Sequence, residues 1–280
     1  MRAELRDSLE FLYADSTIGK RPCSSTAVDT PRNVVASVHV LLNDVPVDKR
    51  IRLWVVSKGR TVQQAAWFRL IDVPVETNTG TVGFIERDGD VNPHVARRAP
   101  FRVFDAMEPI GSSVKAAAPI TALRLHLPAT GRPGEREYTI AIEVGGECCE
   151  LTVTVRAHFA VVPPVGEGSF PYTNWFTLDL MAERHGLERW SSGHWRMIRR
   201  YADLMAHGRQ NTFWVPLQYI FHMENGLPVL DRQRLRRIVK LFTDAGMYYI
   251  EGGHVAGRTG GEWSATTFDI SLASGVRATS

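Results

Sequence analysis

Long apolar runs are missing from this chain of 280 residues. No stretch approaches the ~20 consecutive apolar residues that a helix needs to cross a bilayer. The first residues, Met1 to Asp7, also lack the apolar core of a secretory signal. The sequence as it stands therefore predicts a cytoplasmic protein without a membrane partner, although a signal peptide removed before this start would leave the same sequence.

A strong charge of one sign is missing as well. The chain has 33 Lys and Arg residues against 30 Asp and Glu residues, which gives a net charge of +3. A nucleic-acid-binding domain usually carries clustered positive charge, so no nucleic-acid partner is expected. With 44% hydrophobic and 22% charged residues, the composition is that of a folded globular protein. It gives no indication of the oligomeric state.

Cysteine is scarce, and the short motifs of several enzyme classes are absent. Cys23, Cys148 and Cys149 are the three cysteines. Adjacent residues of a strand point to opposite faces, so Cys148 and Cys149 are not expected to form a disulfide. All three are expected to be small buried hydrophobes. The chain has no Cys-x-x-Cys, His-Glu-x-x-His, phosphate-binding Gly-rich loop or Gly-x-Ser-x-Gly motif, and no metal site is expected.

Alternation between apolar and polar residues dominates the first 160 residues. The clearest strand patterns cover residues 34–41, 50–56, 121–127, 138–142 and 151–155. Turn residues separate them, for example Asn43-Asp44, Lys58-Gly59 and Gly145-Gly146. Short alternating strands with frequent turns predict an antiparallel β-sandwich domain over residues 1–160. Trp54 and Trp67 are expected in its core.

The pattern changes after a Pro- and Gly-containing linker at residues 161–170. Strands are predicted at residues 171–176, 212–217 and 247–251, with amphipathic helices at residues 192–207 and from Asp231 to Gly246. Alternating strands and helices predict a parallel sheet. The fold class is therefore multidomain β plus α/β, with residues 171–280 forming the first three β/α units of a TIM-type barrel.

Three β/α units do not close a barrel, which needs eight strands. Two interpretations follow: the second domain is a small open α/β layer, or the chain is part of a longer barrel protein. We favour the second, because a few uncovered parallel strands would leave unpaired edges. The 280 residues alone are then expected to be inactive.

Candidate functional residues lie where the predicted parallel strands end, because β/α barrels carry their sites there. Glu251 and His254 flank Gly252-Gly253, whose freedom to adopt positive φ would allow a close approach to a ligand. Trp263 could stack on a sugar ring. The predicted substrate-binding residues are Asn174, Trp175, Gln218, Glu251, His254, Arg258 and Trp263.

Several segments resemble the start of the catalytic barrel of glycoside hydrolase family 123 and its uncharacterised relatives. The resemblance rests on residues 172–176, 194–201, 210–216 and 245–254, and on residues 92–93 and 97–101 of the preceding sandwich. It implies a retaining β-N-acetylgalactosaminidase-like activity in which the acetamido group of the substrate is the nucleophile and an adjacent Asp-Glu pair on the fourth strand assists. No Asp-Glu dipeptide occurs in the chain, so no catalytic residue is assigned.

The resemblance implies a carbohydrate or glycoconjugate substrate and an acid/base reaction that requires no cofactor. It leaves open the sugar and the linkage. Two other interpretations stay open at this point. The chain could be a non-catalytic carbohydrate-binding protein with Trp54, Trp67 or Trp263 as a platform, or a purely structural β-sandwich protein.

Overall fold

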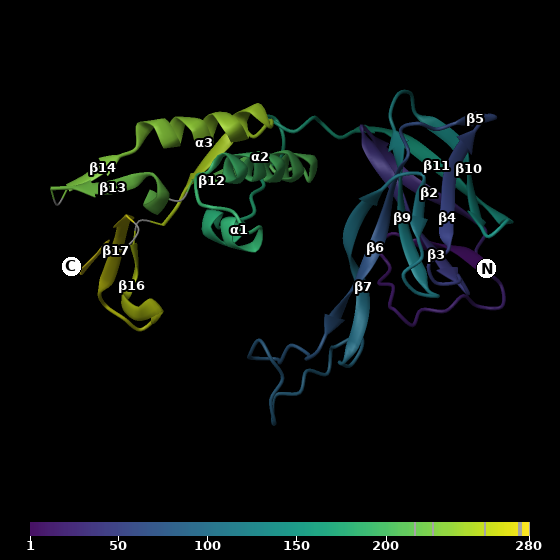
Figure 1. Cartoon of the computed structure of the whole chain (residues 1–280), viewed down its shortest axis with the longest axis horizontal. Coiled ribbons are helices and arrows are strands. Elements are labelled where there is room, and N and C mark those ends of the chain that lie inside the picture. The colour runs from purple at the N-terminus through teal and green to yellow at the C-terminus, as the bar shows by residue number, and fades with distance from the viewer. Residues whose placement is uncertain (216, 226, 255, 274–275, 280) are drawn as a thin grey trace. The chain divides into compact units, whose positions relative to one another are not determined.

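The computed structural model describes residues 1–215, 217–225, 227–254, 256–273 and 276–279, with the backbone alone for Gln218, Met223 and residues 268–279. The chain forms two compact units, Met1–Val162 and Pro163–Ser280 (Figure 1). Their division falls inside the stretch predicted as a linker. Within the described residues, no helix has the length and apolar character needed to cross a bilayer.

The first unit contains two β-sheets. One has the order β1 (Arg2–Asp7), β3 (Val34–Asn43), β9 (Thr121–Ala129), β6 (Ala66–Val75) and β7 (Phe101–Ile110). The other has the order β2 (Ser25–Arg32), β11 (Glu147–Val161), β10 (Gly134–Val144), β4 (Arg50–Ser57) and β5 (Arg60–Thr61), with β8 (Ser113–Lys115) also paired to β4. The prediction of purely antiparallel sheets is wrong at one place, because β2 runs parallel to β11.

Both sheets contribute to one hydrophobic core, which explains the alternating sequence pattern. On β9, Leu123, Leu125 and Leu127 are fully buried, as are Ile140 and Ile142 on β10. The five strands predicted most clearly from alternation are all present. Trp67 lies in this core as predicted, whereas Trp54 is only half-buried, because it points away from the face that carries Leu53 and Val55.

The cysteines differ from expectation. All three are free thiols, and Cys23 and Cys148 are exposed. Cys149 is half-buried, and this burial raises the pKa of its thiol. Cys148 follows the Gly145-Gly146 turn at the start of β11, where the strand emerges from the turn into solvent. The prediction of three buried hydrophobes is therefore wrong for Cys23 and Cys148.

Among its described residues, the second unit combines helices with three small sheets. Its helices are α1 (Leu178–Arg184), α2 (Ser192–His207) and α3 (Arg232–Asp244), with short 3₁₀ turns η1 (Leu217–Tyr219) and η2 (Thr259–Gly261). Strands β12 (Thr212–Val215) and β15 (Tyr249–Gly252) pair in parallel. Strands β13 (Phe221–Glu224) and β14 (Leu227–Leu230) form a hairpin, and β16 (Ala256–Arg258), β17 (Phe268–Ala273) and β18 (Val276–Thr279) form an antiparallel sheet.

The two long helices confirm the sequence prediction: α2 has the predicted bounds, and α3 ends at Asp244, two residues before the predicted end at Gly246. The Ser191 side chain accepts a hydrogen bond from the backbone of His194 and begins α2, which ends at Gly208. Asp231 caps α3 in the same way by accepting from the backbone of Arg234. Ile198 and Ala202 on α2 and Ile238 and Phe242 on α3 pack into the core of the unit. An apolar stripe along one face and a capping residue at the start together identify such helices in a sequence.

The predicted strand at residues 171–176 is not formed. The carbonyl of Tyr172 accepts hydrogen bonds from the backbone N–H groups of Asn211 and Thr212, at 3.2 and 3.1 Å. The N–H of Tyr172, however, donates to the side chain of Asn211 at 2.8 Å. This side chain takes the place of a backbone acceptor, so the segment lies beside β12 without continuing a ladder.

Candidate functional site

The carboxyl ends of β12 and β15 bring the central candidate residues together. Because these strands are parallel, both end at the same edge, and Trp214 is the direct register partner of Glu251. Opposite residues of neighbouring strands project to the same face. The strand pairing therefore places an indole beside a carboxylate, and the segment before α1 adds Trp175.

Trp175 is the centre of this group. Its indole Nε1–H donates to Oε1 of Glu251 at 3.0 Å. Its ring stacks on that of Trp214, with centroids 5.9 Å apart and planes 26° apart. The ring of His254 meets it edge-on at 5.4 Å. Trp175 nevertheless stays 61% exposed, so much of the indole is available to a ligand. We call Trp175, Trp214, Glu251 and His254 the tryptophan cluster.

The second carboxylate oxygen of Glu251 is the chemically notable atom of this cluster. Oε2 is buried and has no hydrogen-bond partner among the described residues. A buried polar atom without a partner carries a desolvation cost, so a donor arriving there gains more than at an exposed carboxylate. The tryptophan cluster thus offers a flat apolar surface next to an unsatisfied acceptor, which suits a molecule with a C–H face and hydroxyl donors.

The remaining predicted residues have other surroundings. The Asn174 side chain is exposed and donates to the hydroxyl of Tyr172 at 2.7 Å. Arg258 donates to the carbonyl of Ala265 at 2.7 Å, and its guanidinium lies 6.0 Å from the ring of Trp263, which is 87% exposed. The Gln218 side chain lies outside the described residues. Arg258 and Trp263 flank η2 and form a second group.

At Gly252 the backbone does not use the conformational freedom of glycine. Its φ is not positive, and a Cβ atom built there would meet nothing within 4 Å. Glycine is therefore not required by the backbone at this position. What the missing side chain leaves is open space at the end of β15.

Trp214 is the residue that the sequence interpretation missed. It lies in the strand predicted at residues 212–217, but its position beside Glu251 depends on the strand register. Parallel pairing of the two predicted strands was the signal that could have found it, but sequence alone does not fix the offset between strands.

A polar network connects α1 to η1. The hydroxyl of Tyr219 donates to Oδ2 of Asp179 at 2.8 Å, and Arg189 forms an ion pair with the same carboxylate. Burial, reinforced by Asp179, raises the pKa of Tyr219 to about 12. Tyr219 is only 7% exposed and packs in the core of the second unit, whereas the side chains of Asp179 and Arg189 are 42% and 39% exposed. No group of three or more His, Cys, Asp or Glu residues within the described ranges is placed to bind a metal.

No protein-family model matches the sequence, and no curated protein matches it. A solved family 123 glycoside hydrolase from Clostridium perfringens, described in terms of glycolipid glycan hydrolysis, has a similar structure, with a TM-score of 0.69 at 10% sequence identity. The similarity covers 100% of this chain and 52% of that one, so the chain spans about half the length of the enzyme. The chain thus has a predominantly β, family 123-like fold.

Two further structures match less well. The PapD-like domain 7 of human CEP192 has a TM-score of 0.22 at 10% identity, over 56% of this chain and 86% of that one. WR4, an MSP family member of C. elegans, has a TM-score of 0.22 at 13% identity, over 47% of this chain and 92% of that one. Neither score is high enough to carry an inference.

Proposed function

We propose that the chain is part of a glycoside hydrolase, in which residues 171–280 supply one wall of a sugar-binding site on an incomplete TIM-type barrel. The observation that carries this proposal is the tryptophan cluster at the common end of two parallel strands, where barrel enzymes bind substrate. The family 123-like fold supports the same conclusion. The substrate class is a carbohydrate or glycoconjugate.

In this proposal, each residue of the cluster has a distinct role. The exposed indole of Trp175 stacks on the C–H face of a sugar ring, while Trp214 supports it from behind. Oε1 of Glu251 fixes the indole, and Oε2 accepts a hydrogen bond from a sugar hydroxyl. Aromatic surface with a few placed polar groups is typical of ligand sites.

The chemistry proposed for the whole enzyme is retaining, substrate-assisted hydrolysis of N-acetylhexosaminides. The acetamido oxygen of the substrate attacks the anomeric carbon as the glycosidic bond breaks, and an acid protonates the leaving oxygen; water then opens the oxazolinium intermediate. No residue of this chain is assigned the acid/base role. The 280 residues alone are expected to bind sugar without cleaving it.

The sugar-binding role predicts specific losses of affinity. Titration of the 280-residue chain with methyl N-acetyl-β-D-galactosaminide, followed by isothermal calorimetry, is expected to show binding that Trp175→Ala weakens at least tenfold. Glu251→Gln keeps an acceptor for the Trp175 indole but replaces Oε2 with a donor. It is expected to weaken binding by about tenfold, as for loss of a hydrogen bond to a charged group.

Matched variants define the site. Glu224→Gln removes an exposed carboxylate on β13 and should leave the affinity unchanged. Trp263→Ala tests whether the group formed by Arg258 and Trp263 takes part in sugar binding, since the Trp263 indole is also exposed. Equal affinity of the wild type and the Trp175→Ala variant would contradict the proposed wall.

A non-catalytic carbohydrate-binding protein is the second candidate, and the exposure of Trp175 and Trp263 favours it. It shares the binding prediction but differs in the reaction. Hydrolysis by the complete protein separates the two candidates.

A further inference from the structure

A pocket opens in the first unit where two neighbouring strands separate. Strand β6 pairs with β9 only from Ala66 to Arg69. Had this ladder continued, Leu70 and Ile71 would face Ala122 and Thr121 at the start of β9. Instead, β6 continues with β7, and their pairing is irregular between Ile71 and Asp72. The gap between the strands holds a cavity of about 180 Å³.

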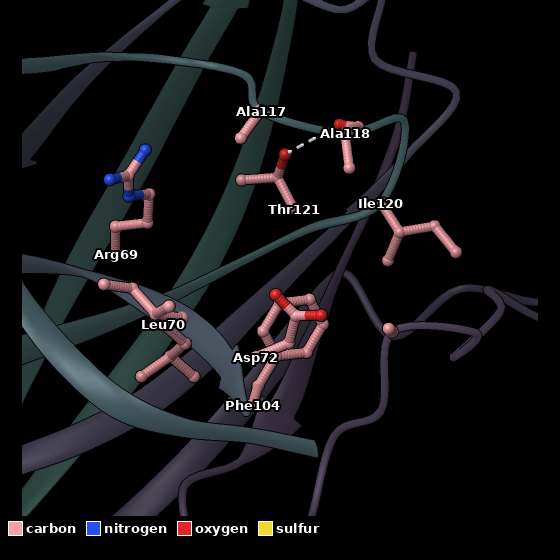
Figure 2. A pocket seen from close by; sticks show the side chains of 10 residues that line it. Arg69, Leu70, Asp72, Phe104, Ala117, Ala118, Ile120 and Thr121 are labelled. Atoms are coloured by element: carbon pink, nitrogen blue, oxygen red, sulfur yellow. Dashed lines mark hydrogen bonds between the residues drawn. The ribbon is translucent and has the colours of Figure 1, made fainter. Parts of the chain in front are cut away.

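The walls of this pocket are mainly apolar (Figure 2). Leu70 and Thr121 are buried and form its floor, whereas Ile71, Ala117 and Ala118 are exposed and form its rim. The full lining is Ala14, Arg69, Leu70, Ile71, Asp72, Phe104, Ala117, Ala118, Ile120 and Thr121. A dry cavity of about 150 Å³ accommodates a benzene-sized molecule, so this pocket has room for one small ring.

The charges of the pocket are balanced by partners. Arg69 forms an ion pair with Glu108 at 2.6 Å. Asp72 forms an ion pair with Arg102. An additional charge on a ligand would therefore find no opposite charge left to compensate its loss of hydration. This arrangement favours an uncharged occupant.

Two polar groups remain to orient such an occupant. Nε of Arg69 is buried without a hydrogen-bond partner among the described residues, although a guanidinium has five N–H donors to satisfy. The Thr121 hydroxyl donates to the carbonyl of Ala118 at 3.3 Å, as the dashed line in Figure 2 shows. Its lone pairs are left to accept. One donor and one acceptor are thus present in a largely apolar pocket.

We propose that this pocket binds a small neutral amide with an apolar body. The amide carbonyl accepts from the Arg69 guanidinium, the amide N–H donates to the Thr121 hydroxyl, and the apolar body rests on Leu70, Ile120 and Phe104. The site belongs to the first unit and does not depend on the proposed sugar-binding role of the second.

Benzamide is the probe that tests this proposal on the 280-residue chain, with toluene and benzoate as comparison ligands. Titrations followed by NMR are expected to give benzamide at least fivefold higher affinity than either. Toluene lacks the amide, and benzoate carries an uncompensated charge. A result in which benzamide does not bind, or in which benzoate binds more tightly, overturns the proposal.

Variants locate the binding. Ala117→Phe places a ring at the rim and is expected to weaken benzamide binding at least tenfold, whereas the matched Ala27→Phe, on an exposed position of the other sheet, should not. Arg69→Lys keeps a cation for Glu108 but removes the Nε donor, and it is expected to reduce the affinity for benzamide to that for toluene. Binding that survives Ala117→Phe unchanged would place the ligand elsewhere and overturn the assignment.

Discussion

Replacing Asn211 with alanine is expected to lower the free energy of unfolding of the second unit by about 3–4 kcal/mol, the largest stability effect that we predict. Asn211 is fully buried at the start of β12. Its Oδ1 accepts from the backbone N–H of Tyr172 at 2.8 Å, and its Nδ2 donates to the hydroxyl of Ser169 at 2.9 Å. Alanine leaves the Tyr172 N–H without this acceptor and removes the bond to Ser169, whose hydroxyl keeps its bonds to the backbone of Gly166.

The backbone of Asn211 adds to this role. Its carbonyl accepts from the N–H groups of Tyr248 and Tyr249, at 2.8 and 2.9 Å, so the same residue joins the segment before α1 to both parallel strands. Loss of its side chain is expected to release the segment that carries Trp175, which would also weaken the tryptophan cluster.

Urea unfolding followed by tryptophan fluorescence measures the effect, because five of the seven tryptophans belong to the second unit (residues 175, 190, 195, 214 and 263). Asn174→Ala, an exposed position in the same segment, is the matched control and should change stability by less than about 0.5 kcal/mol. A small effect of Asn211→Ala would show that the segment is held by other contacts.

His194→Leu is expected to destabilise the second unit by about 2–3 kcal/mol. His194 is completely buried on α2. Its Nδ1 accepts from the backbone N–H of Trp190 at 3.0 Å, and its Nε2 lies 3.1 Å from the carbonyl of Leu178. These partners require a neutral ring with the proton on Nε2. Leucine fills similar space but satisfies neither backbone group.

The same residue predicts a pH dependence. Burial lowers the pKa of His194 below its usual 6.5. Between the folded and unfolded pKa values the unfolded chain binds more protons, so stability is highest above pH 6.5 and falls as the pH decreases below it. In His194→Leu this contribution should disappear. Burial also lowers the pKa of His39, to about 4, so this residue likewise makes the first unit less stable in acid. The wild type and the variant are therefore compared by the unfolding transition of the second unit.

His207→Leu, an exposed position at the end of α2, is the control for both measurements. This variant should change the free energy of unfolding at neutral pH by less than about 0.5 kcal/mol. The loss of stability at low pH should be the same as in the wild type. If the wild type and His194→Leu lost the same amount of stability at low pH, a group other than His194 would be responsible for the pH dependence.

Elements that depend on local sequence could be predicted well. Helix α2 was predicted at both ends because its apolar stripe, its Ser191 cap and the glycine at 208 agree. Strands β9 and β10 followed from clean alternation. The seven-residue helix α1 was missed, since two turns are too short to show a periodic stripe. The β13–β14 hairpin was not predicted, because its strands have only four residues each.

Features that depend on distant contacts were out of reach. The loss of the strand at 171–176 results from one side chain, that of Asn211, which lies about forty residues along the chain and accepts from Tyr172. The tryptophan cluster was predicted in part, since Trp175, Glu251 and His254 were chosen from their positions at strand ends. Trp214 was not, because its place beside Glu251 depends on strand register.

The glycosidase assignment is tested most directly by assaying the protein encoded by the complete reading frame that contains these residues. With 4-nitrophenyl N-acetyl-β-D-galactosaminide as substrate, we expect release of 4-nitrophenol, and we expect NMR to show that the first sugar product keeps the β configuration. Absence of turnover on every aryl hexosaminide tested would contradict the assignment and leave sugar binding without cleavage.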